Sequence, residues 1–217
     1  FSSYPMHFPA FVVAGVCLLL ACGIGDVIGK PFILCVCLTL WAGGYMEKWQ
    51  QEKDACGKWM YARMLYHSGG YKAANEAYEK LYPVLRGRGA FLFEYGHSLH
   101  KSFLYGDSNK YLEEACRYSS DPMVLNVMGK NYQEQHCYEQ AEKFFYRAIH
   151  RLPGRIYPYY LLANLYAEPD FYKPDKLKEA ADSVLTKEPK VHSTAIDEMR
   201  SEVREILKRK DKCEIKK

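Results

Sequence analysis

A small side chain recurs in this chain at steps of 34, 33 and 34 residues, at Ala62, Gly96, Gly129 and Ala163. A fixed period of this length is typical of stacked supersecondary units, because each unit leaves an apolar face that only its neighbour can cover. Apolar residues at helical spacing on either side indicate two short antiparallel helices per unit. The period therefore predicts an all-α solenoid. The alternative is an ordinary helical bundle in which the spacing is incidental.

The third copy of the repeat is the clearest, and it resembles the tetratricopeptide (TPR) signature at every position. Its Gly129 and Ala141 would let two helices approach closely, while Tyr132 and Phe145 would fill the wedge between hairpins. This resemblance implies an interaction scaffold by default. The structural positions that it assigns over the whole array are Ala62, Ala74, Gly96, Gly129, Tyr132, Ala141, Phe145, Ala148, Pro153 and Ala163.

The repeats set the predicted domain organisation. Two copies are irregular: the second fits only after an insertion of about three residues before Tyr111, and the fourth after a two-residue insertion at Pro169. Ile196, Met199 and Val203 at helical spacing predict a capping helix that closes the last apolar face. The expected segments are four repeats within 54–189 (55–88, 89–121, 122–155 and 156–189), a capping helix at 193–208 and a basic tail at 209–217.

The first 49 residues differ in composition from the array. Asp26 and Lys30 are the only charged residues up to Met46, and they separate two long uncharged runs. Runs of this kind predict a transmembrane helical hairpin at 1–49, with helices at 8–25 and 31–49 and the lipid bilayer as a partner. The alternative is a buried hairpin in the core of a soluble protein. Because the chain begins with Phe1, we expect it to be the tail of a longer polypeptide.

No catalytic constellation is evident in the sequence, which lacks a Walker loop, a G-x-S-x-G turn and an H-E-x-x-H helix. The eight cysteines lack the spacing of a zinc site or a disulfide framework. A net charge of +4 on 217 residues is too mild to suggest nucleic acid. The prediction is therefore no catalytic residue, no metal and no cofactor in this segment, with His7 an interfacial side chain.

A ligand, if one binds, is expected on the inner face formed by the first helix of each pair. The residues three before and one after each small anchor would line a groove of aromatic, basic and amide side chains. Such a groove suits an extended peptide, or an anionic or sugar-bearing ligand; alternatively it only packs against the protein's own membrane part. The predicted groove residues are Trp59, Arg63, Phe93, His97, Asn126, Lys130, Tyr160 and Asn164.

Both ends of the chain resemble the O-antigen ligase and polymerase family. The amino-terminal segment 1–11, FSSYPMHFPAF, is similar to the stretch that leads from a periplasmic loop into the last membrane helices, and 190–200 resembles the closing segment of members with helical repeats. The family transfers or polymerises glycans carried on a polyprenyl diphosphate. The resemblance implies a multi-pass protein of the bacterial inner membrane, with catalytic residues upstream and the array in the periplasm.

Two classes of function follow. In the first, the chain is the carboxy-terminal part of a surface-glycan ligase or polymerase whose repeats dock a protein or the acceptor, with the polyprenyl-linked glycan bound upstream. In the second, the chain is a membrane-anchored TPR scaffold without enzymatic activity.

Overall fold

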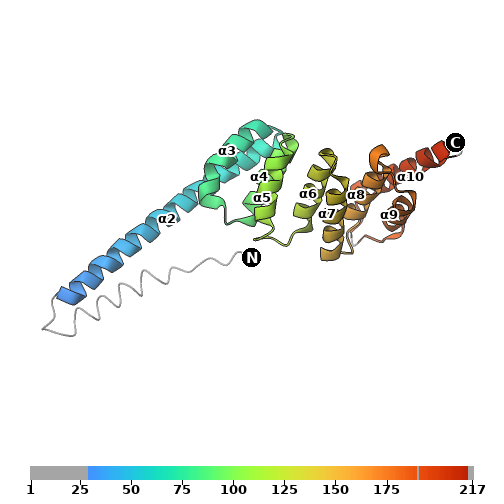
Figure 1. The fold of residues 1–217 in the computed structure, drawn as a ribbon. Coiled ribbons are helices and arrows are strands. Elements are labelled where there is room, and N and C mark those ends of the chain that lie inside the picture. Colours follow the sequence, from blue (N-terminus) through green and yellow to red (C-terminus); the bar gives the residue numbers. More distant parts are fainter. Residues whose placement is uncertain (1–28, 190, 215–217) are drawn as a thin grey trace. The chain divides into compact units, whose positions relative to one another are not determined.

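The computed structural model describes residues 29–189 and 191–214, and this part of the chain is all helical (Figure 1). It divides into two compact units, Phe1–Gly57 and Lys58–Lys217, and the helical array lies in the second. Successive helices of the array form antiparallel pairs that stack side by side, which confirms the predicted all-α, TPR-like solenoid. The elements are α2 Gly29–His67, α3 Tyr71–Leu85, α4 Gly89–Lys101, α5 Tyr105–Ala115, α6 Pro122–Glu134, α7 Tyr138–Arg151, α8 Tyr157–Ala167, η1 Pro169–Phe171, α9 Pro174–Thr186 and α10 Thr194–Glu214.

The first three pairs turn at the same point in the repeat. The residue after the first helix has a positive φ in each: +83° at Gly69, 62° at Phe103 and 57° at His136. The next amide then bonds back to the first helix, as from Leu104 N to Leu99 O at 3.0 Å. This is a Schellman motif, which satisfies carbonyls at the helix end. The two steps between these positions are 34 and 33 residues.

The regular turns correct the prediction of an insertion in the second repeat. α5 begins at Tyr105, in register with the helices before and after it, so that no extra residues are needed. The residue that covers the small anchor Gly96 is Leu112, the equivalent of Phe145 in the next repeat. Sequence reasoning had chosen Tyr111 because an aromatic residue usually fills this wedge. In the fourth repeat, the extra residues near Pro169 form the 3-10 turn η1.

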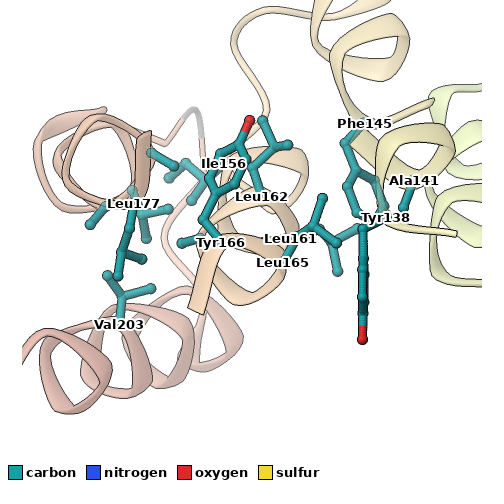
Figure 2. Packing of buried hydrophobic residues seen from close by; sticks show 14 residues of the cluster. Tyr138, Ala141, Phe145, Ile156, Leu161, Leu162, Leu165, Tyr166, Leu177 and Val203 are labelled. Atoms are coloured by element: carbon teal, nitrogen blue, oxygen red, sulfur yellow. The ribbon is translucent and has the colours of Figure 1, made fainter. Parts of the chain in front are cut away.

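The core of the carboxy-terminal half is a continuous apolar cluster between stacked hairpins (Figure 2). It begins with Phe145 on α7, continues through Leu162 and Tyr166 on α8 and reaches Leu177 on α9. Val203 on α10 is fully buried against the end of this cluster. α10 therefore covers the last apolar face of the array. It extends to Glu214, beyond the predicted end at 208 and into the predicted basic tail.

The structure differs from the prediction for the start of the chain. The predicted membrane helix at 8–25 lies outside the described residues. In place of a second helix that ends near residue 49, α2 runs without a break from Gly29 to His67. Across the residues that the structure describes, no helix is both long and apolar enough to span a membrane. The predicted transmembrane hairpin is therefore not found in this part of the chain.

Candidate functional site: the inner groove

Glu94 joins the first two repeats on the inner face of the array. Its carboxylate accepts a hydrogen bond from Trp59 Nε1 at 2.8 Å and forms an ion pair with Arg63. Tyr78 from α3 donates to the same carboxylate at 3.4 Å. The Arg63 guanidinium also lies over the Trp59 ring, 4.9 Å from its centroid. Trp59 and Arg63 are thus held by their own chain and help to bind α2 to α4.

A row of stacked rings continues along α4. The His97 ring lies 5.8 Å from Phe93 and 5.7 Å from His100, nearly parallel to both, and its Nδ1 bonds the Tyr66 hydroxyl. Burial, followed by the nearby positive charges of His100 and Lys101, lowers the pKa of His97 to about 4. Burial also lowers the pKa of His100. His97 is therefore neutral at physiological pH.

A buried polar network supports this row from beneath. The Nδ1 of His100 bonds Asn131 Oδ1 at 2.6 Å, and the amide of Asn131 donates to Ser108 and Asn109 at 2.8 and 2.7 Å. Ser108 in turn donates to the carbonyl of Gly96 at 2.6 Å. Because buried polar groups are costly unless they are paired, this network fixes how α4, α5 and α6 meet.

An open cavity of about 640 Å³ lies farther along the inner face, between α6, α8 and α10. The Tyr157 and Tyr160 rings are stacked at 6.2 Å, and Tyr160 donates a hydrogen bond to Glu202 of α10. Burial lowers the pKa of the Lys130 ammonium in the cavity wall. The lining residues are Lys130, Gln133, Glu134, Tyr157, Tyr160, Leu161, Asn164, Ala167, Glu168, Ile206 and Arg209.

The predicted groove residues fall into two groups. Lys130, Tyr160 and Asn164 line the cavity together. Trp59, Arg63, Phe93 and His97 belong instead to the network of the first two repeats. Asn126 is only 2% exposed, so it does not form part of the open groove surface.

Sequence reasoning missed several residues of this face. The cavity uses Gln133 and Ala167, each four residues after a small anchor, a position one helical turn farther along the same face. That spacing was available in the sequence. The contribution of Ile206 and Arg209 was not, because it depends on α10 packing beside α8.

The positions assigned as structural are mostly buried. A side chain at Gly129 would meet the Phe145 ring, with the added Cβ 2.3 Å from Cε1. Tyr132 is half-buried and its ring stacks on Phe144 at 5.2 Å. Pro153 is the exception, since it lies exposed in the turn after α7. Ala62, Ala74, Ala141, Ala148 and Ala163 are all fully buried.

No cluster of three or more metal-ligating side chains with the geometry to hold an ion occurs among the described residues.

The architecture is shared with solved structures of MamA. A crystal structure of MamA protein has a TM-score of 0.55 at 16% sequence identity, over 71% of this chain and 88% of that chain. The structure of MamA 41-end from Desulfovibrio magneticus RS-1 has a TM-score of 0.53 at 17% identity, over 95% of this chain and 99% of that chain. No protein-family model and no curated protein matches the chain. At these identities the likeness shows the fold alone.

Proposed function

We propose that this protein is an interaction scaffold whose inner groove binds an extended peptide of a partner protein. The observation that carries the proposal is the cavity between α6, α8 and α10, in which stacked tyrosines lie beside charged groups of both signs. Tyr157 and Tyr160 offer apolar area with polar tips, a combination common at protein interfaces. The fold shared with MamA is consistent with a helical scaffold.

The charges of the cavity favour a peptide over a polyanion. Lys130 and Arg209 could pair with an acidic side chain, but Glu134 and Glu168 line the same cavity. These carboxylates would repel a densely anionic glycan. A peptide can place a side chain of either sign, and an apolar residue, against one small surface. We therefore expect a ligand with an aromatic or aliphatic residue next to a charged one.

A peptide-display experiment tests this function. Random peptides are selected on the full chain, and binding of one selected peptide is measured by fluorescence anisotropy. Tyr160→Ala should weaken binding about 30-fold or more, since anchoring aromatics carry about 2 kcal/mol of binding energy. Tyr61→Ala is the matched control, because Tyr61 is 58% exposed and lies outside the cavity lining. Equal affinity of both variants would refute the assignment of the groove.

A second candidate function rests on the resemblance of segments 1–11 and 190–200 to O-antigen ligases and polymerases. Under it, the chain follows the catalytic part of a glycan ligase of the bacterial inner membrane, 1–49 forms a membrane hairpin, and the array faces the periplasm. The array then docks the acceptor or a partner.

Labelling of an exposed cysteine tests that location. Cys137 is free and exposed in the turn after α6. If the array is periplasmic, an impermeant thiol reagent should label Cys137 in intact spheroplasts, and Cys137→Ser should remove that signal. Labelling that needs lysis would place the array in the cytoplasm and contradict this candidate.

A further inference from the structure

The turns between repeats gather on one edge of the array. The topology of stacked hairpins places the α3–α4, α5–α6 and α7–α8 connections together, and the turns within each pair on the opposite edge (Figure 1). The connecting segments between repeats are 86–88, 116–121 and 152–156. We refer to the edge they form, with the last turn of the helix before each, as the inter-repeat edge.

The inter-repeat edge is basic and the opposite edge is not. Its three connecting segments hold four arginines and one aspartate, a net charge of +3. The four connections within the repeats hold one lysine and two acids, a net charge of −1. The single acid of the inter-repeat edge, Asp121, is used locally, because its carboxylate caps α6 through the amide of Met123 at 2.9 Å.

The arginines of this edge extend into solvent. Arg86, Arg117 and Arg155 are exposed. In the part of the chain that the structure describes, no carboxylate pairs with any of these three. Arg88 and Arg151 are exposed at the same edge. Repulsion among such side chains is relieved when a negatively charged surface lies against them.

An exposed apolar side chain accompanies the arginines at every turn. Val84, Tyr118 and Leu152 are 39%, 54% and 40% exposed, and they lie exactly one repeat apart, at steps of 34 residues. No comparable series exists on the opposite edge, where the exposed Phe103 corresponds to Gly69 and His136 in the neighbouring turns. The exposed apolar positions thus follow the arginines.

We propose that the inter-repeat edge is a docking surface for an anionic lipid bilayer. Arginines gain energy from the negative surface potential of such a membrane, while side chains such as Tyr118 and Leu152 can enter the boundary between headgroups and acyl chains. Neighbouring helices pack about 8–10 Å apart, so consecutive turns present these pairs at short, regular intervals to a flat surface. Nucleic acid fits less well, because a phosphate backbone offers no apolar layer for the three exposed residues. This surface is separate from the peptide groove.

Hydrogen exchange on vesicles tests the proposal. The full chain is incubated with vesicles of phosphatidylcholine alone, or of equal parts phosphatidylcholine and phosphatidylglycerol. Exchange in 83–90, 116–122 and 150–156 should slow several-fold on the anionic vesicles only, and added salt should reverse the effect. The turns at 67–71, 102–106 and 135–139 should not change. Because the comparison is between two lipids, binding through the amino-terminal segment to both does not confuse it.

Two variants with equal net charge make the test specific. The triple change Arg86→Gln, Arg117→Gln and Arg155→Gln should abolish the protection. The control changes Lys72, Lys143 and Lys178 to Gln, all of which are exposed on α3, α7 and α9 away from these turns, and it should retain the protection. Equal exchange on both lipids, equal loss in both variants, or protection by duplex DNA but not by vesicles would each overturn the proposal.

Discussion

Gly129 shows how one residue sets the distance between two helices. A Cβ at this position would lie 2.3 Å from Phe145 Cε1, so Gly129→Ala requires α6 and α7 to separate or the ring to move. We expect a loss of about 1–3 kcal/mol in the free energy of unfolding, measured by chemical denaturation. Gly106→Ala is the control, because nothing lies within 4 Å of a Cβ there. A similar loss in both variants would contradict the close packing of this pair.

His97 makes the stability of the array depend on pH. An unfolded histidine has a pKa of about 6.5, whereas burial lowers the pKa of His97 to about 4. Between these values the unfolded chain binds a proton that the folded chain does not, so the free energy of unfolding falls as the pH drops from 6.5 toward 4. The loss is on the order of 3 kcal/mol at most.

Thermal melts at pH 7 and pH 5 measure this effect. His97→Gln removes the titrating ring, and it should reduce the difference between the two melting temperatures. The exposed His67 is the control, and His67→Gln should leave the difference unchanged. The prediction fails if His97→Gln retains the full pH dependence.

At the scale of the element, the turns within the repeats hold backbone strain. Phe103 and His136 have positive φ values of 62° and 57°, a region that costs residues other than glycine about 1–2 kcal/mol. Phe103→Gly should therefore raise the free energy of unfolding by up to about 1 kcal/mol in a denaturant titration. Gly69→Ala, at the equivalent position, should lower it by a similar amount. A destabilised Phe103→Gly variant would mean that the exposed Phe103 ring contributes more than the strain.

The capping helix α10 should stabilise mainly the end of the array. Val203 is fully buried in the cluster with Leu177, and Val203→Asp would place a charge there. Since repeats contact mostly their neighbours, hydrogen exchange should increase in α8 and α9 and change little in α4 and α5. The exposed Arg204 serves as control through Arg204→Ala. Uniform loss of protection across the array would show that it unfolds as a single cooperative unit.

At the scale of the whole molecule, the 33- to 34-residue period was sufficient to predict the solenoid, because small anchors and covering residues are local requirements of each hairpin. The period did not reveal that Leu112 replaces an aromatic residue over Gly96, since either side chain fills that space. Half of the predicted groove residues line the cavity or its edge, but Trp59 and Arg63 are held by Glu94. That partner lies in another repeat, and no local pattern indicates it.

The most direct test of the account is a hydrogen-exchange map of the full chain with and without a selected peptide. If the inner groove is the binding surface, the peptide should protect 130–134, 157–168 and 202–209, which contain the residues lining the cavity. The outer helices α3, α5 and α7 should exchange as before. Protection confined to those outer helices, with the cavity segments unchanged, would contradict the central claim that this solenoid is a peptide-binding scaffold.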